Sequence, residues 1–386
     1  MADVAAGVQI GASALYRHFR GKSDLLVAVL DTGMDRLEAA TAGGGSPERL
    51  LAAMARVQMD RREYPALWER ERDELPVEAR ERLATRRDRL DRVLLDALQA
   101  ADPDNGGTDV EGRRHADGAV HPALEARARA AAAVALSPSY HHSQIEPDRG
   151  VALLGSAAAR CLATGAELLD PGALPAVDLD PGGVDPATGP SLLPTARGEA
   201  LVAVAGRLFA ERGYHAVSLG EIGAAAGIAG PSIYNHFASK VDLLTTILQR
   251  GNEVLWFTLH QALAGAGDPG QALRLLLDGY IGVFTARPGV VPVLLGEIAS
   301  LSPEPRRRLR TTQQRYVTEW VALLRAFRPA LEEPEARLLV HAAFAVANTL
   351  TRPTGSGAGS GRGFPPAWVR ALAGVALGLP SELLVD

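Results

Sequence analysis

Residues 218–244 read SLGEIGAAAGIAGPSIYNHFASKVDLL, and this segment has the pattern of two short helices joined by a tight turn. Ser218 can cap a short helix that runs to about residue 226, because its hydroxyl can accept a backbone N–H one turn into the helix. Glu221 occupies the capping-box position three residues later. Gly227 then supplies a tight turn, since glycine adopts the left-handed conformation at little cost. The pattern predicts the first helix and the turn of a helix-turn-helix.

The second helix of this motif carries Pro231 near its first turn, where a missing N–H costs nothing, and we expect it to extend through Phe237. Small and apolar residues should pack the two helices together: Ala224, Ala225, Ile228, Ile233 and Phe237. The outward side chains are candidates for contacts with a DNA groove or its phosphates. These candidates are Ser218, Pro231, Ser232, Tyr234, Asn235 and His236, with Lys240 at the start of the next long helix.

A longer amphipathic helix precedes the motif. It follows Thr195, carries apolar residues at helical spacing and ends at Gly213, which can stop a helix in the left-handed conformation. Helical spacing recurs along almost the whole chain, whereas alternating runs typical of strands are scarce. The predicted fold class is therefore all-α.

Three separated blocks of this sequence resemble a single protein family. The blocks are Leu208-Phe209-Ala210-Glu211-Arg212-Gly213-Tyr214, residues 222–227, and Ile233-Tyr234-Asn235-His236-Phe237 followed by Lys240, Asp242, Leu243 and Leu244. Together they resemble the DNA-binding domain of the TetR/AcrR family of bacterial transcriptional regulators. The resemblance implies that Tyr234 and Lys240 mainly contact phosphates and that bases are read around Pro231, Ser232 and Asn235. It also implies a helical ligand-binding and dimerisation domain downstream, and repression as the usual mode.

The two halves of the chain repeat each other. Residues 3–26 match residues 221–244 without a gap, sharing Tyr16/Tyr234, His18/His236, Phe19/Phe237, Lys22/Lys240, Asp24/Asp242, Leu25/Leu243 and Leu26/Leu244 among others. In a second match the offset between paired positions is eight residues longer, and it pairs Leu75/Leu301, Arg80/Arg306, Leu83/Leu309 and Arg89/Arg315 among others. We therefore predict a tandem duplication of a TetR-like unit.

The first copy departs from the second in two ways. Met1 comes only two residues before the matched segment, so we expect an N-terminally truncated copy without the bracing helix, from either a misplaced start or decay. Gln9 stands where the second copy has Gly227, and a non-glycine residue in a left-handed turn costs about 1 kcal/mol. The truncation should expose Val4, Leu15 and Phe19. The DNA-binding candidates of this copy are Ser13, Tyr16, Arg17, His18 and Lys22.

Composition breaks suggest five segments. They are a truncated helix-turn-helix domain at 1–34, a helical effector and dimerisation domain at 35–169, a Pro/Gly/Asp-rich linker at 170–194, a complete helix-turn-helix domain at 195–250 and a second helical effector and dimerisation domain at 251–386. Two further Pro/Gly-rich stretches, 101–121 and 352–366, are predicted to be loops.

The effector domains offer aromatic and polar candidates for a small apolar ligand: Tyr64, Trp68, Tyr280, Glu297, Tyr316, Trp320, His341 and Asn348. Ordinary core or surface positions remain the alternative for each of them. Two late helices per half, 122–136 with 149–163 and 334–351 with 366–378, carry alanine-rich faces suited to close packing. We expect them to make an intrachain pseudo-dimer, or a homodimer, that presents two recognition helices to double-stranded operator DNA.

Composition excludes other classes of protein. The single cysteine, Cys161, fits a bacterial cytoplasmic protein that is nucleoid-associated when bound to DNA, and no run is long enough for a membrane span. A net charge of −5 does not exclude a local basic surface, and so does not exclude DNA binding. We find no nucleophile elbow, phosphate loop or metal-ligand set, and so expect no enzyme activity, no cofactor and no metal. The remaining alternative is a ligand-sensing or scaffold protein derived from TetR regulators, with reduced or no DNA binding.

Overall fold

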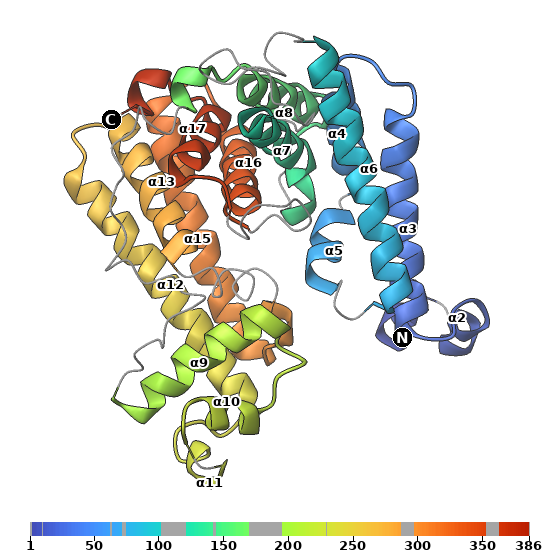
Figure 1. The fold of residues 1–386 in the computed structure, drawn as a ribbon, viewed down its shortest axis with the longest axis vertical. Coiled ribbons are helices and arrows are strands. Elements are labelled where there is room, and N and C mark those ends of the chain that lie inside the picture. Colours follow the sequence, from blue (N-terminus) through green and yellow to red (C-terminus); the bar gives the residue numbers. More distant parts are fainter. Residues whose placement is uncertain are drawn as a thin grey trace. The chain divides into compact units, whose positions relative to one another are not determined.

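The computed structural model describes residues 2–9, 11–61, 64–71, 75–101, 121–141, 144–169, 195–228, 230–286, 297–352 and 363–385. Those residues form helices and their connections, with no strand among them, which confirms the all-α fold class. The chain divides into two compact units, Met1–Leu162 and Ala163–Asp386, and each unit carries its own set of helices (Figure 1). The predicted linker at 170–194 lies outside the described residues, so the five predicted segment boundaries stay predictions.

Unit 1 begins with three helices in helix-turn-helix order and continues with longer ones. Its elements are α1 (Ala2–Gly7), α2 (Ala12–His18), α3 (Lys22–Thr41), α4 (Pro47–Asp60), α5 (Tyr64–Glu71), α6 (Val77–Ala101), α7 (Pro122–Leu136), η2 (Ser137–Tyr140) and α8 (Pro147–Leu162). The core of α3 and α4 is formed by fully buried leucines and methionines, including Leu30, Met34, Leu51 and Met54.

An ionic cluster joins α3 to α6 in unit 1. Arg86 on α6 donates hydrogen bonds to Asp31 at 3.1 Å, to Asp35 at 2.5 Å and to both carboxylate oxygens of Glu38 at 2.9 and 2.6 Å. The hydrogen bonds from Arg86 lower the pKa of Glu38 below its ordinary value. Because the Arg86 side chain is only 16% exposed, water screens this cluster less than it screens a surface ion pair.

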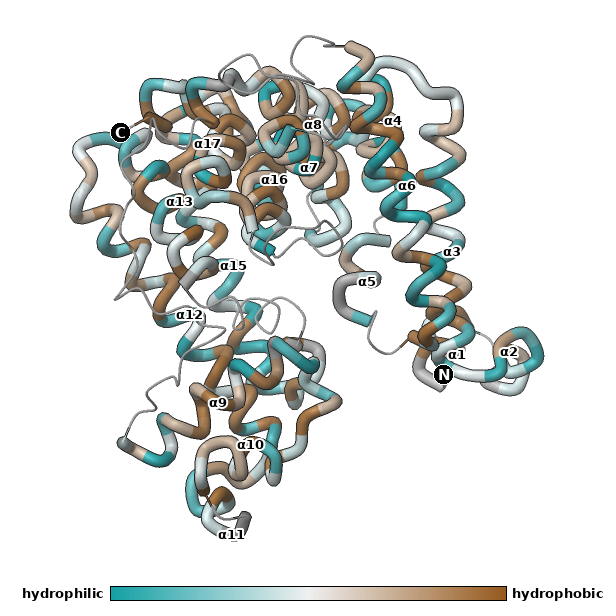
Figure 2. The backbone as a smooth tube through the Cα atoms, in the orientation of Figure 1, coloured by the Kyte–Doolittle hydropathy of each residue, from teal (hydrophilic) through white to brown (hydrophobic). Residues whose placement is uncertain are grey.

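Unit 2 also contains helices in helix-turn-helix order, and a further helix precedes them. Its elements are η3 (Ala166–Leu168), α9 (Arg197–Arg212), α10 (Leu219–Ala225), α11 (Gly230–Ile233), α12 (Lys240–Gly265), α13 (Pro269–Ala286), η4 (Glu297–Ser300), α15 (Pro303–Phe327), α16 (Glu333–Thr351), α17 (Pro366–Leu377) and η5 (Ser381–Leu383). Helices α9, α10 and α11 lie together at one end of α12 (Figure 1). Hydrophobic positions predominate along α16 and α17 (Figure 2).

The late helices have nearly the predicted bounds. Helix α7 spans the predicted residues, and α8 and α16 begin two residues and one residue early. Helix α17 ends at Leu377 because Gly378 adopts a left-handed conformation with φ 82°. The predicted loops fall mostly at 102–120 and 353–362, outside the described residues. Cys161 is fully buried, as expected of a small apolar side chain, and burial raises the pKa of its thiol to about 12.

The long helices α6, α12 and α15 all carry several charged side chains. In the part of the chain that the structure describes, no helix is both long enough and apolar enough to cross a bilayer.

Candidate nucleic-acid interface

Helix α9 braces the helix-turn-helix of unit 2. Leu201, Val204 and Phe209 on α9 are buried in one apolar cluster with residues of α10, α11 and α12. The helix ends at Arg212 because Gly213 adopts φ 79°, and the Phe209 ring then meets the Tyr214 ring edge to face with centroids 5.1 Å apart. Figure 2 shows hydrophobic positions along both α9 and α12. The predicted bracing role of this helix is confirmed.

The first helix of the motif, α10, has the predicted capping box. Ser218 Oγ accepts a hydrogen bond from the Glu221 backbone N–H at 3.2 Å, and Glu221 Oε2 accepts one from the Ser218 backbone N–H at 2.8 Å. Arg212 also donates to Glu221 Oε1 at 2.6 Å. The hydrogen bonds from Ser218, and then the one from Arg212, lower the pKa of Glu221 to about 2. The Ser218 side chain is exposed, so its predicted DNA contact stays a prediction.

The turn between α10 and α11 depends on two glycines. Gly227 adopts φ 67°, as predicted. Gly223 faces α11 so closely that a Cβ there would lie 2.2 Å from Ile233 Cδ1. The sequence-based assignment of this packing to Ala224 and Ala225 was wrong, because both alanines are exposed. Only a residue without a side chain fits the helix contact, and Gly223 occupies that position.

The recognition element is shorter than predicted. Helix α11 ends at Ile233, which is 1% exposed, and residues 234–236 form a turn in which the His236 and Phe237 N–H groups donate to the Ile233 carbonyl at 2.9 and 3.0 Å. That turn presents Tyr234, 63% exposed, together with the exposed side chains of Asn235 and His236. Ser232 is half-buried, and the side chain of Pro231 lies outside the described residues. Three of the predicted contacts therefore lie side by side on one exposed turn.

Lys240 has internal partners that the sequence did not predict. Its Nζ donates hydrogen bonds to the carbonyl oxygens of Tyr214 and Val217, each at 2.8 Å, and lies 4.3 Å from the centre of the Tyr214 ring. These contacts fasten the loop between α9 and α10 to the start of α12. The predicted phosphate contact of Lys240 stays a prediction.

Comparison with known proteins agrees with this geometry. The family model described as bacterial regulatory proteins, tetR family, matches residues 201–247, the segment from α9 into α12. The HTH-type transcriptional repressor KstR2 of Mycobacterium tuberculosis (strain ATCC 25618 / H37Rv) is 30% identical over 145 residues, which cover 35% of this chain and 71% of that protein. The chain belongs to the tetR family. The family match falls on the helix-turn-helix of unit 2.

Two further matches are weaker. The first covers less of the chain, and the second shows only limited structural similarity. The HTH-type transcriptional activator FasR of Mycolicibacterium smegmatis (strain ATCC 700084 / mc(2)155) is 39% identical over 84 residues, which cover 22% of this chain and 38% of that protein. The crystal structure of the TetR-family regulator PfmR from Thermus thermophilus is 25% identical, with a TM-score of 0.41, over 46% of this chain and 97% of that protein. The relatives thus correspond to about half of this chain or less.

In unit 1, helices α1, α2 and the start of α3 lie in the segment 3–26 that matches residues 221–244 in sequence. Gln9 adopts φ 58° where Gly227 adopts φ 67°, so the left-handed turn is kept without a glycine. Tyr16 is 54% exposed, and Ser13, Arg17 and His18 are exposed beside it. Lys22 is exposed and donates to Glu71 at 3.3 Å, in contrast to the internal contacts of Lys240. The predicted DNA contacts of unit 1 stay predictions.

The prediction that Val4, Leu15 and Phe19 are exposed is only partly right. Val4 is 46% exposed, as expected, and Phe19 is half-buried. Leu15 is only 7% exposed, so the prediction for that residue was wrong. Helices α1 and α2 pack against each other.

Five of the predicted effector residues gather in the core of unit 2. Tyr280 Oη donates to Asn348 Oδ1 at 3.1 Å, and the Trp320 ring lies between those of Tyr280 and Tyr316, at centroid distances of 6.1 and 6.3 Å. His341 joins through Phe344, whose ring centroid is 6.1 Å from that of His341 and 5.0 Å from that of Trp320. Burial, and then the nearby Arg337 charge, lower the pKa of His341 to about 4. We call Tyr280, Tyr316, Trp320, His341, Phe344 and Asn348 the aromatic cluster.

The other three effector candidates lie elsewhere. Tyr64 and Trp68 are buried on α5 of unit 1, where Tyr64 packs against Gly33, and the Glu297 side chain lies outside the described residues. Sequence reasoning missed Phe344 and Trp256, whose ring centroid lies 6.0 Å from that of Tyr316. Helical spacing could have indicated Trp256, since it follows Asn252 and precedes His260 by four residues each on α12.

Proposed function

We propose that this chain regulates transcription by binding operator DNA through the helix-turn-helix of unit 2, most simply as a repressor. The observation that carries this proposal is the exposed turn bearing Tyr234, Asn235 and His236, held by a capped α10, the Gly223 contact and the bracing helix α9. The hydroxyl, amide and imidazole groups there can donate to phosphates and base edges. Family membership over residues 201–247 supports the same assignment.

We further propose that a small apolar effector binds at the aromatic cluster and changes the position of the helix-turn-helix. Helix α15 supports this link, because Leu309 belongs to the apolar cluster around α9 to α12 and Tyr316, two turns on, belongs to the aromatic cluster. Two helical turns correspond to about 10 Å. Rings, one imidazole and one amide would select an apolar molecule with few polar groups.

We also propose that two helix-turn-helix motifs act together on the DNA. The alanine-rich helices α7, α8, α16 and α17 would join the repeated units as an intrachain pseudo-dimer, or join two chains as a homodimer, with no catalytic role for either unit. Such a regulator would act on bacterial DNA in the cytoplasm. The tandem duplication on which this arrangement rests is supported by the gapless match between residues 3–26 and 221–244.

Fluorescence anisotropy with labelled duplex from upstream of the protein's own gene tests the proposal. Asn235→Ala should lose about 1–3 kcal/mol of affinity for the specific site, the value of a good contact to a base edge. Gln261→Ala, an exposed position far along α12, is the matched control and should bind like the unchanged chain. No binding at low salt would overturn the proposal and leave a ligand sensor or scaffold derived from such regulators.

A further inference from the structure

A lysine joins the two ends of the helix-turn-helix of unit 2. Lys240 is the first residue of α12, and its Nζ donates hydrogen bonds to the carbonyl oxygens of Tyr214 and Val217, each at 2.8 Å. These two residues come shortly before α10, whereas Lys240 follows α11 and the exposed turn. The same Nζ lies 4.3 Å from the centre of the Tyr214 ring. The ammonium therefore connects the chain just before the motif to the chain just after it, and we call these contacts the lysine bridge.

The lysine bridge holds the peptide unit at which α10 begins. The carbonyl of this unit, on Val217, accepts a hydrogen bond from Lys240. Its N–H, on Ser218, donates to Glu221 Oε2 at 2.8 Å. Because Ser218 is the N-cap of α10, the bridge fixes where α10 starts relative to α12. Helix α10 then contacts α11 through Gly223, and α11 leads into the exposed turn.

The surroundings of the ammonium favour this internal position. Lys240 is half-buried, and Tyr214 and Val217 are 5% and 1% exposed. A cation in the first turn of a helix is repelled by the positive end of the helix dipole. Two carbonyl oxygens and the negative face of the Tyr214 ring offset that repulsion. An ammonium that turned outward to a phosphate would lose both hydrogen bonds and the ring contact.

We propose that Lys240 is a positioning residue for DNA binding, and that it acts through the lysine bridge rather than by contacting a phosphate. This inference rests on the proposed DNA binding by unit 2. The bridge sets the position of α10 relative to α12, and thereby the position of the turn that bears Tyr234, Asn235 and His236. Loss of the bridge would misplace side chains that read bases, and so would weaken binding to a specific site more than binding to unrelated DNA.

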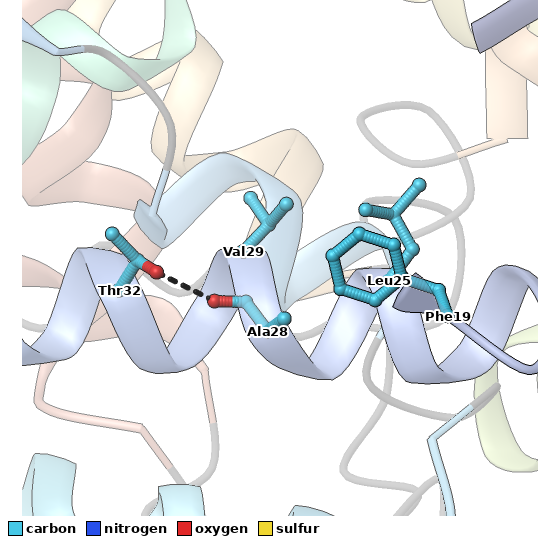
Figure 3. Close-up of a pocket in the computed structure, with 5 residues that line it drawn as sticks. All are labelled: Phe19, Leu25, Ala28, Val29 and Thr32. Carbon is cyan, nitrogen blue, oxygen red and sulfur yellow. Dashed lines mark hydrogen bonds between the residues drawn. The ribbon is translucent and has the colours of Figure 1, made fainter. Parts of the chain in front are cut away.

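The matched lysine of unit 1 has different surroundings. Lys22 begins α3, its side chain is 73% exposed, and it donates a hydrogen bond to Glu71 on α5 at 3.3 Å. The same end of α3 borders an apolar groove. This groove is lined by Phe19, Leu25, Ala28, Val29 and Thr32 (Figure 3). The Lys22→Met substitution therefore removes the same charge at the matched position while leaving the lysine bridge of unit 2 intact.

Salt titrations of DNA affinity separate positioning from phosphate contact. One lysine that contacts a phosphate contributes about 0.9 to the slope of log affinity against log salt concentration. The two duplexes are the labelled segment upstream of the protein's own gene and a scrambled duplex of the same base composition. Lys240→Met should lower affinity for the upstream duplex at least about fivefold, as loss of one base contact does, and affinity for the scrambled duplex less than about twofold. Its slope on either duplex should change by less than about 0.3.

Two controls accompany Lys240→Met. Lys22→Met should leave the ratio of the two affinities within about twofold of that of the unchanged chain, because a phosphate contact is independent of base sequence. In the free Lys240→Met chain, hydrogen exchange should be at least about tenfold faster at the amides of residues 218–222 and within about twofold at those of residues 243–248 in α12. If the methionine variant does not fold, Lys240→Gln replaces it, because its amide keeps N–H donors for the two carbonyls, and its slope should also stay within about 0.3.

Four results would overturn the proposal. A slope lowered by about 0.9 would assign Lys240 to a phosphate contact. Equal losses on the two duplexes, or no loss on either, would mean that Lys240 does not position the reading turn. Unchanged exchange at residues 218–222 would mean that the bridge does not hold α10. Failure of the unchanged chain to bind either duplex at low salt would overturn the proposed function itself, and this inference with it.

Discussion

Replacing Gly223 by alanine should destabilise the helix-turn-helix of unit 2. The new Cβ would lie 2.2 Å from Ile233 Cδ1, 2.9 Å from Ile233 Cγ1 and 3.0 Å from the Ile228 carbonyl oxygen. Ile233 is 1% exposed, so it cannot turn away without disturbing the core, and overpacking of this kind costs about 1–3 kcal/mol. Alanine recovers up to about 1 kcal/mol through its higher helix propensity. The expected net loss is about 1–2 kcal/mol.

The matched control lies in the same helix. A Cβ at Gly220 would find its nearest neighbour, Ser218 Oγ, at 3.9 Å, so Gly220→Ala should leave stability unchanged or raise it by up to about 1 kcal/mol. Hydrogen exchange of the buried amides of α9 and α12 measures both changes as local opening free energies. If Gly223→Ala proves as stable as Gly220→Ala, the close helix contact does not exist as described.

Three further predictions concern single side chains. Tyr234→Phe should leave folding stability within about 0.5 kcal/mol, because the side chain is 63% exposed, yet weaken DNA binding about five- to tenfold through the lost hydroxyl; unchanged affinity in an anisotropy titration would remove Tyr234 from the interface. The pKa of His341 is lowered to about 4, so as pH falls below 6.5, the ordinary pKa of histidine, the unfolded chain takes up a proton before the folded chain does. The free energy of unfolding of unit 2 should therefore fall by about 2 kcal/mol between pH 6.5 and 4. The His341→Gln substitution should remove this loss, whereas His260→Gln, at an exposed position, should not. Arg86→Gln should destabilise unit 1 by about 2 kcal/mol by leaving three carboxylates close together, and addition of 1 M salt should recover part of the loss; urea unfolding that shows no loss would mean that the cluster contributes nothing.

The parts of the fold that depend on local rules could be predicted from the sequence. Ser218 and Glu221 predict the start of α10, and Gly227 predicts the turn that follows it, because helix capping and the left-handed conformation of glycine depend on only a few neighbouring residues. Even the left-handed conformation at Gln9 followed from the repeat. The bounds of α7 were predictable for the same reason, since Pro122 begins the helix.

The parts that depend on tertiary packing could not be predicted. An alanine and a glycine in one short helix look equally suitable as contact residues, and only the approach of Ile233 selects Gly223 over Ala224. The sequence suggested that Lys240, at the start of a helix, points toward a phosphate. In the structure its ammonium donates hydrogen bonds to two carbonyl oxygens of a loop more than 20 residues earlier in the chain. Grouping Tyr280 with Trp320 likewise required knowing how α13 and α15 pack.

One comparison of affinities tests whether the helix-turn-helix of unit 2 reads DNA. Anisotropy titrations of the upstream duplex should be made with the unchanged chain, with Asn235→Ala in unit 2 and with Arg17→Ala in unit 1. We predict that Asn235→Ala lowers affinity at least about fivefold, by removing a base contact, while its helical circular dichroism stays that of the unchanged chain. Unchanged affinity of the Asn235→Ala protein, with a large loss in the Arg17→Ala protein, would contradict the claim and assign DNA reading to unit 1.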